Sequence, residues 1–152
     1  MKSFFEYHNL TEETEPALHE SDSVSVRLGS NNYTLELAET PDKIYKGMSG
    51  RDSIPRKTGM LFVMPKEDMQ EFCMRDCKCN MDIIFVNEDN EVVGLDTMVV
   101  ERPRNKMESE YVYENRLKKY SSDEPAKYVI EIPAGDITRL GLKKRQIINI
   151  PK

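Results

Sequence analysis

The sequence of 152 residues lacks tryptophan, has only two histidines and three cysteines, and contains no long apolar run. No hydrophobic stretch approaches the roughly 20 residues that a membrane-spanning helix needs. Residues 1–22 also lack the continuous apolar core of a secretory signal peptide. We therefore expect a protein that neither spans a membrane nor carries such a signal.

Known catalytic motifs are missing as well. The sequence contains no Gly-rich phosphate loop, no Gly-x-Ser-x-Gly elbow and no His-Glu-x-x-His pair. A Cys/His nucleophile pair would need His8 or His19, and both lie near the N-terminus, far from the apolar segments. We therefore expect no catalytic residues, and we expect the protein to bind a partner or ligand and not to act as an enzyme.

The three cysteines are clustered. Cys73, Cys77 and Cys79 form the spacing C-x3-C-x-C, which differs from the common zinc patterns and is a poor disulfide framework. We expect reduced thiols in a cytoplasm, with no metal and no cofactor. A redox or metal sensor built on the three cysteines stays open as an alternative.

The net charge of −5 is concentrated at the N-terminus. Residues 1–22 contain one base and six acids, whereas residues 23–152 contain 21 of each. An acidic chain is poorly suited to bind nucleic acid through its overall charge. We therefore divide the chain into an acidic N-terminal arm, residues 1–22, and a single β domain, residues 23–152.

Short alternating segments predict that the domain is mainly β. We expect a hairpin over residues 24–38 with its turn at 31–32, and a helical turn over 66–69. Further strands are expected over residues 59–64, 72–74, 82–86, 92–100, 127–132 and 146–150. Two short helices are expected: one starts at Thr40-Pro41, and the other starts at Asp136. Without βαβ alternation, the expected fold is an antiparallel sandwich or a partly open barrel.

Residues 101–126 form an excursion that differs from the rest of the domain. They are strongly charged, contain two prolines, and connect two strands over a far greater length than the usual four to six residues or so. Exposed tyrosines among charges suit protein contacts, so Tyr111 and Tyr113 are candidate contact residues. A plain solvated loop is the alternative.

Charged residues interrupt an apolar region between residues 72 and 85. The candidate ligand-binding residues are Arg51, Arg75, Asp76 and Asp82, around a cleft between the turn at 47–51 and the segment 75–82. We expect the Asp82 carboxylate to accept hydrogen bonds from backbone amides or from one of the arginines. Several nearby methionines would give a soft apolar groove, and an ordinary methionine-rich core is the alternative.

Three blocks of sequence carry a family resemblance. The first is Gly-Met-Ser-Gly-Arg (47–51) with Gly-Met-Leu-Phe-Val (59–63). The second runs from Phe72, Met74 and Arg75 to Asp-Ile-Ile-Phe (82–85), and the third spans residues 126–135 followed by Leu-Gly at 140–141. Together they resemble the bacterial and archaeal family called domain of unknown function 192, over about residues 24–150. The resemblance implies a compact β sandwich with short helices and no established activity.

The chain also departs from that family. Members usually show Trp where this chain has Cys73, and Asn-Thr where it has Asp76-Cys77. They show Pro-Leu at residues 80–81 and Gly-Asp at residues 145–146, where this chain has Asn-Met and Arg-Gln. The resemblance combined with these departures implies a scaffold reused for binding.

The N-terminus resembles the leaders of virion proteins in T-even-like phages. Phe4, Phe5 and Tyr7 give it an apolar side, and Leu-Thr-Glu at residues 10–12 matches the site cut by a prohead protease, with Glu12 as the processing residue. A disordered start with chance aromatics is the alternative. The resemblance implies a non-enzymatic phage virion component, made in the host cytoplasm, whose arm and excursion contact other virion proteins. The competing hypothesis is a small cytosolic enzyme or ligand-binding protein with a cleft near Arg51, Arg75 and Asp82.

Overall fold

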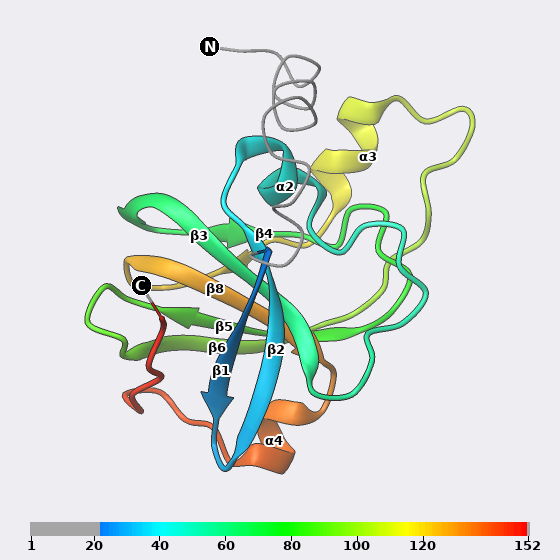
Figure 1. Cartoon of the computed structure of the whole chain (residues 1–152). Coiled ribbons are helices and arrows are strands. Elements are labelled where there is room, and N and C mark those ends of the chain that lie inside the picture. The colour runs from blue at the N-terminus through cyan, green and yellow to red at the C-terminus, as the bar shows by residue number, and fades with distance from the viewer. Residues whose placement is uncertain (1–21, 152) are drawn as a thin grey trace, which may run out of the picture.

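The computed structural model describes residues 22–151, which form a mainly β body with three short helices (Figure 1). Six strands make one sheet in the order β1-β2-β3-β8-β5-β6. They are β1 (Ser23–Leu28), β2 (Asn31–Ala38), β3 (Thr58–Asp68), β8 (Ala126–Pro133), β5 (Met81–Val86) and β6 (Val92–Met98). β4 (Glu71–Phe72) and β7 (Tyr120–Ser121) pair separately. Because β1 and β6 are the two edges, the described strands close no barrel, and the predicted partly open β fold is confirmed.

The sheet is mixed, so the prediction of a purely antiparallel arrangement is wrong. β2 and β3 are parallel, whereas β3 and β5 both pair antiparallel with β8. The connection between β2 and β3 contains α2 (Pro41–Lys46) and is long enough to return the chain to the same end of the sheet. α2 begins as expected, with Thr40 accepting a hydrogen bond from the Lys43 amide.

Three predicted details are corrected. The β1–β2 turn lies at residues 29–30, where Gly29 adopts φ +60, and not at residues 31–32. β3 continues to Asp68, so the expected helical turn over 66–69 is strand. The expected last strand over 146–150 is reduced to one isolated bridge between Glu91 and Ile147.

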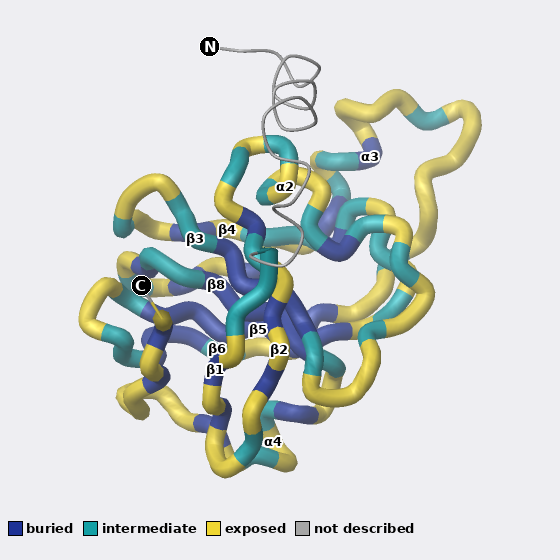
Figure 2. The backbone as a smooth tube through the Cα atoms, in the orientation of Figure 1, coloured by how far each residue is buried: buried dark blue, intermediate teal, exposed yellow. Residues whose placement is uncertain are grey.

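Two apolar clusters fill the two faces of the sheet, and alternation along β8 divides its side chains between them. Ile130 and Ile132 belong to the cluster with Val26, Leu35 and Leu61, next to α4 (Asp136–Leu140). Val129 belongs to the other cluster, which contains the methionines and phenylalanines listed here: Met48, Met60, Met74, Met81, Met98, Phe62 and Phe85. Figure 2 shows the resulting buried centre of the central strands under an exposed surface. This methionine-rich cluster underlies the candidate site.

The excursion contains a helix that the sequence did not predict. α3 (Glu110–Arg116) projects from the body beside α2 (Figure 1). Ser109 caps its first turn by accepting a hydrogen bond from the Val112 amide. Tyr111 is 78% exposed, whereas Tyr113 is 3% exposed and its hydroxyl accepts a hydrogen bond from the Asp76 amide at 2.8 Å. The helical period turns Tyr113 inward, so it packs against the body instead of offering a free contact surface. None of the described helices is long and apolar enough to cross a bilayer.

Candidate functional site

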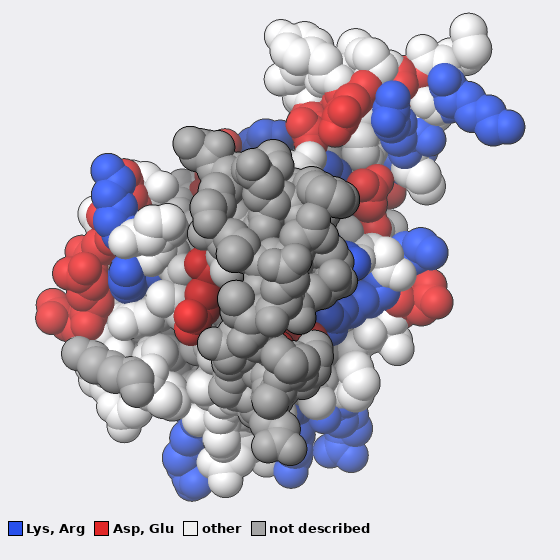
Figure 3. All heavy atoms as spheres, turned by 45° about the horizontal axis from the view of Figure 1, so that its top comes forward, with Lys and Arg blue, Asp and Glu red and all other residues white. Residues whose placement is uncertain are grey.

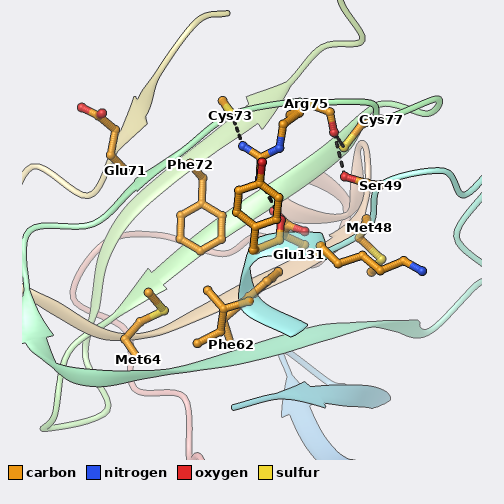
Figure 4. A pocket seen from close by; sticks show the side chains of 14 residues that line it. Met48, Ser49, Phe62, Met64, Glu71, Phe72, Cys73, Arg75, Cys77 and Glu131 are labelled. Atoms are coloured by element: carbon orange, nitrogen blue, oxygen red, sulfur yellow. Dashed lines mark hydrogen bonds between the residues drawn. The ribbon is translucent and has the colours of Figure 1, made fainter. Parts of the chain in front are cut away.

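A pocket of about 200 Å³ opens on the methionine-rich face of the sheet. Its walls come from the end of α2, the following turn, β3, β4 and residues 73–77 (Figure 4). The turn and residues 73–77 are joined by two hydrogen bonds: Ser49 donates to the Arg75 carbonyl at 2.7 Å, and the Gly50 amide donates to the Asp76 carbonyl at 2.9 Å. The turn and residues 73–77 therefore form one side of the pocket, but of the residues expected around a cleft here, only Arg75 lines it.

Apolar side chains make up most of the pocket wall. Phe62 on β3 and Phe72 on β4 meet edge to face with ring centroids 4.9 Å apart. Met48 and Met64 complete this wall, and Figure 4 shows both phenylalanine rings beside the pocket floor. Soft thioethers and aromatic rings suit a ligand with a compact apolar body. At about 200 Å³, the pocket is smaller than the roughly 300–1,000 Å³ typical of drug-sized ligands.

Glu131 lies at the floor of the pocket. It sits on β8 between Met60 of β3 and Ile83 of β5, and it is 4% exposed. Its side chain makes no hydrogen bond or ion pair with any residue of the described range, yet no fully enclosed polar atom of that range lacks a partner. The carboxyl oxygens therefore face the open space of the pocket. Burial raises the pKa of Glu131 to about 8, so the carboxyl is largely protonated at neutral pH.

Arg75 lies at the rim, and its guanidinium already has partners within the protein. Its guanidinium lies 3.8 Å from the centre of the Tyr45 ring, donates to the Tyr45 carbonyl at 2.8 Å, and pairs with Glu114 at 3.2 Å. These contacts hold α2, α3 and residues 73–77 together. Arg75 thus shapes the mouth of the pocket and balances its charge with Glu114.

The cysteines contribute lining atoms. Cys73 and Cys77 line the pocket, while Cys79 does not. Burial, with smaller contributions from nearby acidic groups, raises the pKa of Cys77 to about 12, so this thiol stays protonated and is a poor nucleophile. Within residues 22–151, no three His, Cys, Asp or Glu side chains come together in a way that could hold a metal ion.

The predicted site residues separate in the structure. Arg75 lines the pocket, and Asp76 adopts φ +56 beside it, with its amide and carboxylate bonded to the Tyr113 hydroxyl. Arg51 lies outside the pocket and forms a bidentate pair with Glu36, which lowers the pKa of that carboxyl.

Asp82 also lies outside the pocket and has a structural role. Its carboxylate accepts hydrogen bonds from the Gly135 amide at 3.0 Å and the Ile137 amide at 2.8 Å. The Thr97 hydroxyl donates a third bond at 2.8 Å. The prediction that Asp82 accepts backbone hydrogen bonds is confirmed, and these bonds fix the start of α4.

Glu131 was missed as a site residue. Its signal in the sequence is a lone carboxylate in an apolar strand, at the position that shares its face with Val129. Phe62 was noted only as a strand residue, whereas Met64 and the segment from Phe72 onward were considered as the lining of a soft apolar groove. The other predicted functional residues, Phe4, Phe5, Tyr7 and Glu12, lie outside the described residues.

Comparison with known proteins places the chain among uncharacterised relatives. The family model of DUF192, described as an uncharacterised ACR family, matches residues 24–150. A protein of unknown function from Novosphingobium aromaticivorans is 27% identical, with 84% of each chain covered and a TM-score of 0.65. A candidate transcription regulator from Sinorhizobium meliloti is 22% identical over 84% of this chain and 91% of its own, with a TM-score of 0.66, which shows a shared fold alone. No curated protein matches the sequence.

Proposed function

The chain belongs to the DUF192 family, and on that premise we propose that it is a non-enzymatic binding protein for a small ligand with an apolar body. The observation that carries the proposal is the pocket walled by Phe62, Phe72, Met48 and Met64. Its walls come from strands and from two segments that are joined by one side-chain and one backbone hydrogen bond. A preformed apolar concavity with few polar groups is the usual form of a small-molecule site.

The hydrogen bonds around the pocket favour binding over nucleophilic catalysis. Ser49 and Cys77 both donate to the Arg75 carbonyl, so neither is bonded to a base that would activate it. The guanidinium of Arg75 is paired with Glu114. The polar groups of the rim therefore maintain the shape of the mouth.

The residue at position 73 differs from the one that the family resemblance implies. Cys73 lines the pocket, whereas the family resemblance implies a Trp at this position. An indole is far larger than a thiol, so a Trp would occupy space that the thiol leaves free. We infer that this departure makes room for the ligand.

The test is a titration with benzyl alcohol, followed by NMR of the methionine methyl groups. Met48 and Met64 line the pocket and should shift saturably, while Met107, which is 92% exposed and outside it, should not. Cys73→Trp should abolish the shifts without unfolding the protein. Met69→Trp, at a half-exposed position outside the pocket, is the matched control and should leave them intact. Equal shifts at all methionines, or full binding by Cys73→Trp, would contradict the proposal.

We propose as a second function that the chain contacts other proteins in a phage particle. The favouring observation is the excursion that contains α3, where Met107 is 92%, Tyr111 78% and Val112 52% exposed. Both acidic and basic side chains lie on this projection (Figure 3), so its contacts would not depend on charge of one sign. Purified virions provide the test: the protein should be present in fixed stoichiometry, and its absence there would remove this proposal.

A further inference from the structure

The floor of the pocket presents an acidic group without a partner. The Glu131 side chain has no hydrogen bond or ion pair within the described range, although the residue is 4% exposed. Its two neighbours across the sheet, Met60 and Ile83, have apolar side chains that cannot donate a hydrogen bond to it. Since the carboxyl oxygens face the pocket and no protein group occupies them, they are available to a polar group of a ligand.

The titratable groups around Glu131 leave this position open to a cation. Cys73 and Cys77 come from the segment above it, and Cys79 follows; the thiols of Cys77 and Cys79 have raised pKa values. Glu71 of β4 and Lys46 of α2 are exposed at the mouth, where solvent screens them. Arg75 is paired with Glu114, and burial is the sole cause of the raised pKa of Glu131.

The aromatic wall points to the same kind of ligand. Phe62 and Phe72 both line the pocket, and their edge-to-face arrangement turns different parts of the two rings toward the space (Figure 4). Ring faces attract cations, most strongly where water is excluded. A carboxyl group beside phenylalanine rings is therefore suited to an ammonium group attached to an apolar body.

We propose that the ligand of this pocket carries a primary ammonium group, which Glu131 receives as a carboxylate while Phe62 and Phe72 hold the apolar body. This inference rests on the proposed function of the pocket and names the class of its ligand. Binding moves one proton: Glu131 is protonated in the free protein, and the ammonium ion displaces that proton into solvent as the ion pair forms. The complex then contains one carboxylate and one ammonium, with no net change of charge in the pocket relative to the free, neutral acid.

The proton release fixes the direction of the pH dependence. Below the pKa of the free carboxyl, the affinity for an ammonium ligand should rise about tenfold per pH unit, because less work is needed to ionise Glu131. A neutral ligand of the same shape should show no such rise. At higher pH the ligand amine loses its own proton, and its affinity should fall again.

The experiment compares benzylamine with benzyl alcohol by isothermal titration calorimetry between pH 6 and pH 8. We expect wild-type protein to bind benzylamine at least about tenfold more tightly than benzyl alcohol at pH 8, with proton release visible as a dependence on buffer ionisation heat. Glu131→Gln should lose both the preference for benzylamine and the proton release. Retained binding of benzyl alcohol by the variant would show that its pocket is intact.

Three outcomes are distinguishable. Benzylamine bound no better than benzyl alcohol, or an unchanged preference in Glu131→Gln, overturns the ammonium assignment and leaves the pocket as a binding site. Failure of both probes to bind wild-type protein contradicts the proposed function as well. If Glu131→Gln does not fold, the pH dependence and proton release of wild-type protein decide the assignment by themselves.

Discussion

Replacing Glu131 with glutamine should change how the stability of the protein depends on pH. In the folded protein the carboxyl is protonated up to a pKa of about 8, because it is buried without a partner. In the unfolded chain it ionises near its ordinary value of 4.5. The folded state therefore holds a proton that the unfolded state releases between these two values, and stability is lost as pH rises from 4.5 to 8. Glutamine does not titrate, so the variant should lack this loss.

The magnitude follows from the width of that window. Each unit of pKa difference corresponds to about 1.4 kcal/mol, so wild-type protein should lose about 3 kcal/mol more than Glu131→Gln between pH 5 and pH 8. Below pH 4.5 the group contributes no difference, because both states are protonated. Comparing slopes avoids the separate cost of burying an amide, which is independent of pH.

Urea denaturation followed by circular dichroism, at one-unit intervals from pH 5 to pH 8, measures this difference. Glu71→Gln is the matched control, because Glu71 is an exposed carboxylate at the mouth of the same pocket, and its curve should parallel wild type. Parallel curves for wild type and Glu131→Gln would refute the reasoning, since they would mean that the carboxyl is ionised or partnered in the folded protein.

Three further predictions concern the scaffold, each measured by urea denaturation. Asp82→Ala removes the acceptor of two amides at the start of α4 and should cost about 1–3 kcal/mol, while Asp96→Ala, at an exposed position, should cost little. Gly59→Ala would push a methyl group into the β8 backbone and should prevent stable folding, whereas the added methyl in Gly50→Ala meets open space and should be tolerated far better. Ser109→Ala removes the cap of α3 and should cost about 1 kcal/mol. Wild-type stability of Asp82→Ala, Gly59→Ala or Ser109→Ala would contradict the prediction made for that variant.

The local structure was largely predictable from the sequence. Thr40 followed by Pro41 predicted the start of α2, and the alternation along residues 127–132 predicted which side chains of β8 share a face. These features depend on residues close together in the sequence, so capping chemistry and strand period are enough to identify them. α3 was not predicted, because the excursion is strongly charged and the helix buries a single residue, Tyr113.

The site was harder to predict because it depends on strand order. Alternation shows that Glu131 and Val129 share a face, but it does not say that β8 lies between β3 and β5 with a pocket above it. Arg51 and Asp82 had the right chemistry for a ligand site, yet Arg51 is paired with Glu36 and Asp82 is bonded to amides at the start of α4. Long-range pairing decides which polar groups remain without a partner. Among the described residues that line the pocket, Glu131 is the one buried acidic residue, and its carboxyl is free to bind a ligand.

The central claim is that a buried, unpartnered carboxyl forms the floor of a ligand pocket, and the most direct test is to titrate that carboxyl by carbon-13 NMR. The Glu131 signal should titrate near pH 8 in the free protein and at a clearly lower pH when benzylamine saturates the pocket. A midpoint near 4.5 in the free protein would contradict the claim that the carboxyl is buried without a partner. A midpoint that stays near 8 while the Met48 and Met64 methyl groups respond to benzylamine would contradict the claim that Glu131 receives the ligand.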